Sequence, residues 1–428
     1  MKTIIKNAYV LTMNELGKIY EDGCVLIQDD KIIYVGNEIE CPNYDDAKVI
    51  DAKNNVLMPG LINAHTHLPM TIFKGYGEGL PLNRWLEEKI WPAEDKMTAE
   101  MAYWTSLLGL CEMAMTGTTF FLDMYYLYDG VFKAMEQSGY RGVFSRGVMD
   151  VDGKGDERIK EAIDDYKSFH GRANVEVSMC AHAEYTSSSD LLEKIAEVAR
   201  QYNTGLHIHV SETKQEHMDC IGRHGLSPIQ FFDRLGITDI PIAAAHCVYV
   251  TEKDMEIMAE KNISVLSCPQ SNLKLGSGIA PVKKMLDMGV NVAVGTDGSS
   301  SNNNLDMIED AMLLSLLQRG ILNDAAAITD IKSLQLVTNG GAKALGKEKS
   351  LGKLKEGFLA DIIMIDTDKI EFTPRNDIVS CIVNSGSGRD VCMTMIGGKI
   401  VYQDGRVLFA DVNEVRRKVQ EYADQICD

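Results

Sequence analysis

Positive charge is scarce in this sequence: its 428 residues carry 43 Lys and Arg against 62 Asp and Glu, for a net charge of −19. Proteins that bind nucleic-acid polymers use clustered Lys and Arg to displace counterions from the phosphates. We therefore expect no nucleic-acid polymer as a partner. A small neutral or zwitterionic substrate is compatible with this charge.

Long apolar segments are also missing. Nowhere do eighteen apolar residues follow one another, so we expect no membrane-spanning helix and no membrane partner. Near the N-terminus Lys6 and Asn7 interrupt the apolar residues, which predicts that this end is not a signal peptide. The ten cysteines include no Cys-x-x-Cys pair, a pattern typical of reduced thiols in a cytoplasmic protein rather than of disulfides or a structural zinc site.

The sequence does contain enough apolar material for a large core, since 45% of its residues are hydrophobic. Short strand-forming runs, such as Ile4–Leu11 and Leu359–Asp366, lie near both ends. We expect these runs to form one small β-sandwich domain from both termini, enclosing a central domain. The predicted segments are 1–57 and 347–410 for the sandwich, 58–346 for the central domain, and 411–428 for a C-terminal helix.

The central segment alternates short β-rich runs with helical stretches, for example Ala99–Met115 and Glu157–Phe169. Eight strands that alternate with helices indicate an α/β fold, a parallel (β/α)₈ TIM barrel. The eight predicted runs are the one that ends near His67, Thr118–Met124, Arg141–Gly147, Val175–His182, Gly205–Val210, Ile242–Cys247, Ser264–Cys268 and Asn291–Asp297.

Polar residues mark the carboxyl ends of these predicted strands. In a TIM barrel the strand ends converge on one pocket, where the active site lies. The predicted strand-end residues are His65, His67, His182, His209, His246 and Asp297.

Four of these residues form a plausible metal site. Side chains alternate along a strand, so His65 and His67 point the same way, and with His209 and Asp297 they offer three nitrogens and a carboxylate. Such a set suits one Zn²⁺ ion, although iron, manganese or nickel tolerate the same ligands. An isolated His-x-His also occurs by chance, and an Asp after a strand can cap the next helix.

Other residues near the strand ends suggest acid–base roles or structural ones. Glu212 follows His209 by three residues, where a carboxylate can shuttle protons between water and a substrate nitrogen. Instead of an acid–base role, Glu212 could have the ordinary position of an exposed loop residue. His246 could likewise be a histidine buried in the core with only a structural role. His207 is expected one layer deeper, in a hydrogen-bonded interior position.

The fourth predicted strand limits the number of metal ions. Two-metal barrel hydrolases usually bridge their ions there with a carboxylate or a carbamylated lysine. The sequence Cys180-Ala-His-Ala offers neither, which favours a single ion.

Together these motifs resemble the amidohydrolase superfamily, in its single-metal deaminase branch. The resemblance rests on Pro59 to His67, His209-Val-Ser-Glu212, Ala245-His246-Cys and Gly295-Thr-Asp297. Within that branch the sequence is most similar to the 5-methylthioadenosine/S-adenosylhomocysteine deaminases. That similarity is carried by Pro69 to Gly75, Trp85 to Asp95, Ser145-Arg146-Gly and Ser271 to Pro281.

The resemblance implies a role for each matching residue. His65, His67, His209 and Asp297 match the metal ligands, Glu212 the proton-transferring glutamate, and His246 the histidine that orients the attacking water. The substrate-binding set is completed by Trp85, by Glu94 and His182 near the ribose hydroxyls, and by Arg146 and Arg158 near the homocysteine. Taken alone, Glu94 and Arg158 would be ordinary solvated charges.

The implied reaction is hydrolytic removal of the 6-amino group of an adenosine derivative as ammonia, at a site with one divalent metal ion. Alternative substrates are adenosine, 5′-deoxyadenosine, guanine, a pterin or a triazine. A non-catalytic metal-binding scaffold is the alternative of another class. A homo-oligomer is expected only because such assemblies are common among enzymes of this kind.

Overall fold

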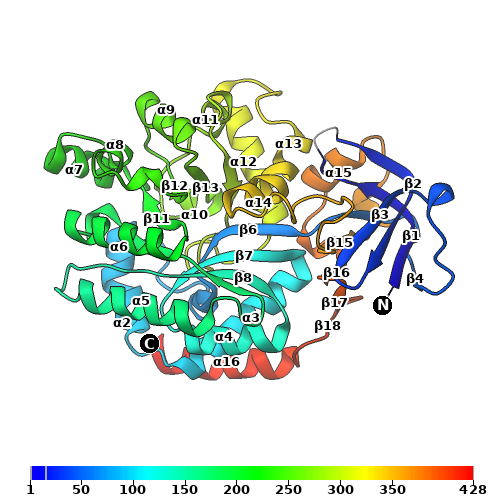
Figure 1. Cartoon of the computed structure of the whole chain (residues 1–428), viewed down its shortest axis with the longest axis horizontal. Helices are drawn as coiled ribbons and strands as arrows, with labels where there is room; N and C mark the ends of the chain where they lie inside the picture. Colours follow the sequence, from blue (N-terminus) through cyan, green and yellow to red (C-terminus); the bar gives the residue numbers. More distant parts are fainter. Residues whose placement is uncertain (1, 15–16, 428) are drawn as a thin grey trace.

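Figure 1 shows a computed structural model, which describes residues 2–14 and 17–427. Parallel strands with surrounding helices form the larger part of the molecule. A large sheet that contains both N-terminal and C-terminal strands lies at one end.

The strands of the central segment pair in parallel within two sheets, ordered β6-β7-β8-β9 and β10-β11-β12-β13-β14. Most of their residues are buried, as expected where helices cover the outer faces. All eight predicted runs are confirmed as strands, and one of them is divided. Their bounds are β6 (Leu61–Thr66), β7 (Thr118–Tyr125), β8 (Arg141–Arg146), β9 (Val175–Val177), β10 (Met179–Ala183), β11 (Leu206–Val210), β12 (Ile242–His246), β13 (Ser264–Ser267) and β14 (Val292–Val294).

The division between β9 and β10 separates the two sheets. Ser178 N donates to Phe144 O at 2.9 Å, and one isolated parallel bridge joins Val148 to Ala181. At the opposite side Asp297 N donates to His65 O at 2.9 Å. In the described part of the chain no continuous ladder crosses either junction, so the fully closed barrel stays a prediction.

Helices follow most of these strands, and the helices predicted from the sequence are confirmed. Thr98, Ser188, Thr213 and Thr251 cap the N-termini of α3, α6, α7 and α9 by accepting backbone N–H groups. The bounds are α3 (Ala99–Thr116), α4 (Tyr128–Ser138), α5 (Gly155–Phe169), α6 (Ser189–Tyr202), α7 (Lys214–His224), α8 (Pro228–Arg234), α9 (Glu252–Glu260), α10 (Pro269–Lys274), α11 (Val282–Asp287) and α12 (Met307–Leu322).

Two helical stretches are interrupted by a π-helical turn. The first joins α1 (Leu82–Trp85) to α2 (Trp91–Glu94) and lies between β6 and α3, beside the ends of the strands. The second joins α13 (Asp330–Gln335) to α14 (Gly341–Ala344). Because π-helical turns are often found at functional sites, the first stretch is of interest for the pocket.

Strands from both ends of the chain share one sheet of nine strands, ordered β18-β17-β16-β15-β5-β1-β2-β3 with β4 beside β1. Its buried core includes Ile5 and Val25 from the N-terminal segment and Met393 and Met395 from the C-terminal one. A separate sandwich domain stays a prediction. The bounds are β1 (Lys2–Leu11), β2 (Ile19–Gln28), β3 (Lys31–Asn37), β4 (Lys48–Asp51), β5 (Val56–Pro59), β15 (Ile362–Ile365), β16 (Val391–Ile396), β17 (Lys399–Gln403) and β18 (Arg406–Val407), with α15 (Ile378–Asn384) between β15 and β16.

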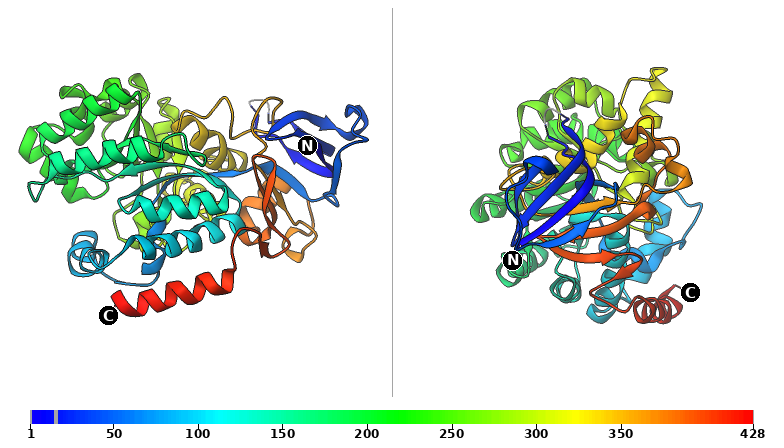
Figure 2. Two further views of the ribbon diagram at one scale, coloured as in Figure 1. Left: turned by 60° about the horizontal axis from the view of Figure 1, so that its bottom comes forward. Right: turned by 90° about the vertical axis from the view of Figure 1, so that its right-hand side faces the viewer.

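The last helix, α16 (Val412–Ile426), runs along the outside of the central part next to α3, as both figures show (Figures 1 and 2). Val415 and Val419 are buried, and Tyr422 Oη donates to Glu100 at 2.8 Å. Within the described residues, no helix is long and apolar enough to cross a membrane. The ten cysteines, all within the described residues, form no disulfide bond.

Candidate active site

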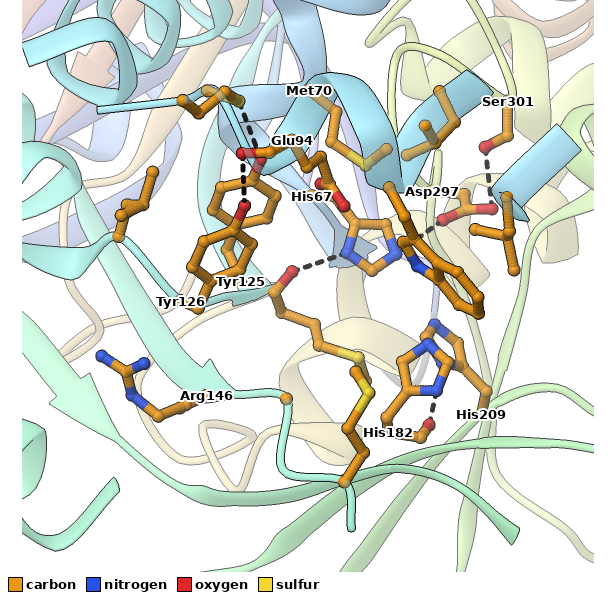
Figure 3. Close-up of a pocket in the computed structure, with 18 of the residues that line it drawn as sticks. His67, Met70, Glu94, Tyr125, Tyr126, Arg146, His182, His209, Asp297 and Ser301 are labelled. Atoms are coloured by element: carbon orange, nitrogen blue, oxygen red, sulfur yellow. Dashed lines mark hydrogen bonds and ion pairs between the residues drawn. The ribbon is translucent and has the colours of Figure 1, made fainter. Parts of the chain in front are cut away.

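The ends of the central strands surround a cavity of about 760 Å³, a volume suited to a nucleoside-sized ligand. Figure 3 shows side chains from several strands directed into it. Buried His65 lies at the same strand end as His67, beside the cavity. The predicted site residues that line the cavity are His67, Trp85, Glu94, Arg146, Arg158, His182, His209, Glu212, His246 and Asp297.

The predicted metal ligands lie close together. Asp297 Oδ1 lies 3.3 Å from His65 Nε2 and 3.1 Å from His67 Nε2. Two overlapping groups, His65/His67/Asp297 and His65/His209/His246, have donor atoms within 4.8 Å of one another. His246 thus belongs to the group that contains His209, whereas Asp297 belongs to the group that contains His67, and His65 is common to both.

Hydrogen bonds fix the orientation of two of these histidine rings. His67 Nδ1 lies 2.6 Å from Met124 O, and His209 Nδ1 lies 2.9 Å from His182 O. A carbonyl oxygen only accepts, so Nδ1 must carry the proton in both rings. In the neutral rings the Nε2 atoms therefore present lone pairs, as metal-binding histidines do.

His65 is oriented by a longer chain of hydrogen bonds through Ser145 and His207. Ser145 Oγ donates to Asp123 O at 2.7 Å, so it must accept from His207 Nδ1, also at 2.7 Å. Burial holds the pKa of His207 well below its usual range, so its ring is neutral and Nε2 accepts from His65 Nδ1 at 2.9 Å. The lone pair of His65 then lies on Nε2, the atom that faces Asp297.

These donors fit a divalent metal ion. His65 Nε2 is buried without a hydrogen-bond partner, although it lies beside the carboxylate. Asp297 is held by Ser271 Oγ at 2.6 Å and Ser301 Oγ at 2.9 Å, both on Oδ2 (Figure 3 shows the second bond). A carboxylate beside neutral imidazoles is a donor set typical of zinc and related ions.

Backbone strain and charge both single out this region. Asp297 has φ of 62° and His246 of 70°, in the left-handed region that costs energy for residues other than glycine. Burial opposes ionisation of Asp297, yet the adjacent His65 and His67 rings hold its pKa well below the usual range. Burial likewise lowers the pKa of His67, but Asp297 outweighs it and raises that pKa to about 9. The site therefore favours a positive charge.

Glu212 and His246 face each other across the cavity, with Glu212 Oε2 3.7 Å from His246 Nε2. Burial raises the pKa of Glu212, which suits a carboxyl that both gives and takes a proton. The Glu216 carboxylate accepts from the backbone N–H groups of Ser211 and Glu212, each at 2.7 Å, and so fixes this turn. His246 Nδ1 is directed to Asn272 Oδ1 at 2.9 Å.

Trp85, Glu94 and His182 line the cavity as well, and the ring of His182 lies 4.9 Å from the ring of His209. Burial raises the pKa of Glu94 to about 7, although a hydrogen bond from Tyr125 opposes this shift. Tyr126 Oη donates to the backbone carbonyl of Glu94 at 3.1 Å (Figure 3). These groups offer hydrogen-bond partners beside aromatic surfaces, an arrangement that suits a ribose.

Several residues that hold the site were not assigned roles from the sequence. Ser145, Ser271 and Asn272 stand in segments that carried the family resemblance, and so does Ser277, whose Oγ donates to Glu212 Oε1 at 3.4 Å. That resemblance was the available signal for them. Tyr125 ends β7 and Tyr126 follows it directly, so the rule that marked the histidines could have marked them too. Ser301 follows Asp297 by four residues, and no motif or strand-end pattern in the sequence marked it as a site residue.

The pattern of the amidohydrolase family matches residues 56–401 of this chain. The chain belongs to the amidohydrolase family. Enzymes of this family are metal-dependent hydrolases, and the His and Asp group gives this member a matching set of donors.

Several relatives cover almost the whole of this amidohydrolase. It is 40% identical over 427 residues to a 5-methylthioadenosine/S-adenosylhomocysteine deaminase of Thermoanaerobacter pseudethanolicus, with 99% of each chain covered. It is 43% identical to a 5′-deoxyadenosine deaminase of Methanosarcina mazei, with 99% of this chain and 98% of the relative covered.

Among solved structures, an adenosine deaminase of Xanthomonas campestris with bound zinc matches with a TM-score of 0.94 and 30% identity, over 99% of this chain and 98% of the other. A triazine hydrolase matches with a TM-score of 0.91 at 22% identity, over 99% of each chain, which supports the shared fold alone.

Proposed function

We propose that this amidohydrolase is a zinc-dependent deaminase that converts the 6-amino group of adenosine derivatives to the inosine oxo group and releases ammonia. Its proposed substrates are 5′-methylthioadenosine and S-adenosylhomocysteine, with 5′-deoxyadenosine or adenosine as the second candidate. The second candidate is favoured by the 43% identity to the 5′-deoxyadenosine deaminase.

One observation carries this proposal: Glu212 lies over a cluster of histidines and Asp297 inside a nucleoside-sized cavity. We propose His65, His67, His209 and Asp297 as ligands of one ion. When bound, a divalent ion would lower the pKa of a water molecule and so supply the nucleophile at neutral pH.

The chain's own residues have proposed roles around the adenine C6 atom. Asp297 and His246 hold the attacking water and take up its proton. Glu212 protonates a ring nitrogen as the oxygen adds to C6, which prevents a full negative charge from building on the purine. The 6-amino group takes up the proton held by Asp297 and His246 and leaves as ammonia, while the hydroxyl proton passes to Glu212 as the oxo group forms at C6. His246, whose pKa burial lowers but the Glu212 and Asp297 charges raise, stays available to retain a proton.

The rest of the cavity is proposed to bind the sugar and its 5′ substituent. Glu94 and His182 contact the ribose hydroxyls, and Trp85 contributes an apolar wall. Arg146 and Arg158 lie where they could meet a homocysteine carboxylate.

The proposed organisation follows the sequence prediction. A closed (β/α)₈ barrel of residues 58–346 is the catalytic domain, and a small β-sandwich forms from residues 1–57 and 347–410. Residues 411–428 form the C-terminal helix, and the enzyme is cytoplasmic.

A panel of substrates tests the proposal. Purified protein is incubated with 5′-methylthioadenosine, 5′-deoxyadenosine, adenosine, guanine, a pterin and a chlorinated triazine, while ammonia and the ultraviolet spectrum are followed. Ammonia release from the adenosines is expected. Turnover of guanine, pterin or triazine alone would replace the proposed substrate, and a protein that binds metal but turns over none of them would be a scaffold.

A further inference from the structure

The arginines that line the cavity are already paired with carboxylates of the chain. Arg158 Nη1 donates to Asp152 Oδ1 at 2.6 Å, and Nη2 donates to Asp152 Oδ2 at 2.8 Å. Arg158 Nη1 also donates to Met149 O at 2.8 Å. Such a two-point pair is the strongest geometry available between arginine and a carboxylate.

Arg146 is paired in the same manner with helix α5. Its Nε donates to Asp165 Oδ2 at 2.6 Å, and its Nη1 donates to Glu161 Oε2 at 3.1 Å. Asp129, Glu161 and Asp165 line the cavity together with the two arginines, and Asp152 pairs with Arg158 from beside the cavity, so this part of the pocket offers no excess of positive charge.

This balance matters for a substrate that carries an anionic group. To meet a guanidinium charge that is not already neutralised, a carboxylate on the 5′ substituent must displace a carboxylate of the chain. The same holds for a zwitterionic substituent, because its carboxylate also needs a positively charged partner in the pocket. An uncharged 5′ substituent displaces nothing and meets the apolar side chains of Met149 and Val151, which line the same cavity.

The two pairs differ in how easily they open. Asp165 has a side chain only 12% exposed, held within α5, whereas the Asp152 side chain is 42% exposed and belongs to the turn before that helix. The Arg158 guanidinium holds the pKa of Asp152 well below its usual range, so the pair stays charged at neutral pH. Asp152 is therefore the carboxylate that an anionic substrate would displace first.

We propose that Asp152 is a specificity residue: by occupying Arg158, it selects for adenosines with an uncharged 5′ substituent over those with an anionic one. This inference rests on the proposed function, because it concerns the 5′ end of the nucleoside site. It predicts that the wild-type enzyme deaminates 5′-methylthioadenosine with a higher kcat/KM than S-adenosylhomocysteine.

The test is Asp152→Asn, which keeps the shape of the side chain and frees the arginine charge. The ratio of kcat/KM for S-adenosylhomocysteine to that for 5′-methylthioadenosine is expected to rise about 10-fold, the size of one charge-assisted hydrogen bond. The rise should come from a lower KM for S-adenosylhomocysteine. Asp152→Glu, which restores the charge, should return the ratio toward the wild-type value.

Two further variants show that the effect acts through Arg158. Adding Arg158→Met to Asp152→Asn should abolish the gain. Asp156→Asn, which removes a carboxylate that pairs with Lys194 at 2.8 Å, should leave the ratio at the wild-type value. An unchanged or lower ratio in Asp152→Asn would overturn the inference, as would a gain that survives the loss of Arg158.

The same ratio is also measured as dissociation constants by calorimetry in a Glu212→Gln background, where turnover does not interfere. This binding measurement tests the role of Asp152 independently of the proposed deaminase activity. Absence of ammonia release by the wild-type enzyme contradicts the proposed function, whereas unchanged relative binding of the two nucleosides in Asp152→Asn contradicts the inference about Asp152.

Discussion

At the scale of single residues, Glu212 carries the proposed chemistry. Glu212→Gln keeps the shape of the side chain but cannot transfer a proton, so we expect kcat to fall by about 10²- to 10⁴-fold. Metal content, measured by elemental analysis, should stay at the wild-type level because Glu212 is not a proposed ligand. Glu252→Gln at the surface of α9 serves as the control. A Glu212→Gln enzyme that keeps most of its activity would remove Glu212 from this role.

His207 is a residue whose effect should appear in metal binding. Replacing it with Asn breaks the chain Ser145–His207–His65 and leaves the tautomer of His65 unset. Affinity for Zn²⁺, measured by competition with a chelator, is expected to fall by about 10- to 100-fold. Ser145→Ala, a smaller change, should weaken binding in the same direction.

His224→Asn is the matched control for His207, since His224 pairs with Glu184 outside the cavity. If His207→Asn and Ser145→Ala both fold and bind zinc as tightly as the wild type, the hydrogen-bonded chain does not set the metal site.

The sequence predicted which residues meet at the site but not the bonds that orient them. A histidine at a strand end reaches the pocket whatever the exact register, so His65, His67 and His209 could be placed from the strand pattern alone. The contact of Ser145 with His207 depends on the stagger of β8 against β11, which a pattern of apolar residues does not specify. The pairing of Arg158 with Asp152, six residues earlier in the turn before α5, was not foreseen because the charge run around Arg158 predicted only solvated side chains.

At the scale of elements, helix α12 contributes a buried acid that supports the loop after β14. Asp310 accepts from Gln270 N at 3.2 Å and from Asn302 Nδ2 at 3.0 Å, and Asn302 also donates to Thr296 O at 2.9 Å. Burial raises the pKa of Asp310 to about 8. The helix thereby connects a titratable group to the loop that carries Ser301.

This raised pKa has a consequence for stability. Between about pH 4 and pH 8 the folded state keeps the Asp310 proton while the unfolded chain loses it, so this group makes the free energy of unfolding fall as the pH rises. One proton contributes a slope of at most about 1.4 kcal/mol per pH unit. In urea titrations at pH 5, 6, 7 and 8, Asp310→Asn should show a smaller loss of stability with pH than the wild type.

Asp287→Asn, which removes an exposed carboxylate on α11, should keep the wild-type slope. The same slope in Asp310→Asn as in the wild type would mean that Asp310 is ionised in the folded state.

Elements as such were well predicted, because strand and helix periods differ clearly along the chain. The exception is the predicted strand Val175–His182, which the structure divides into β9 and β10. Its apolar residues continue across Ser178, so the change of pairing partner leaves no mark in the sequence. This division also prevents a continuous ladder across that junction.

At the scale of the whole molecule, segments from both ends of the chain meet in one sheet, and the central strands bring histidines more than 140 residues apart into contact, as in the bond between His65 and His207. The order of elements along the chain was enough to predict the parallel strands with alternating helices, whereas the closed barrel and the separate sandwich domain stay predictions. A homo-oligomer stays a prediction, because the sequence pattern that reports on fold does not report on subunit contacts.

The most direct test of the account is a metal titration of the whole enzyme. Metal-free protein, prepared with a chelator, receives increasing Zn²⁺ while ammonia release from 5′-methylthioadenosine is followed. The account predicts no activity without metal, a linear rise, and a plateau at one ion per chain with one ammonia formed for each nucleoside consumed. Full activity in the metal-free protein, a plateau only at two ions, or no ammonia at any zinc concentration would contradict it.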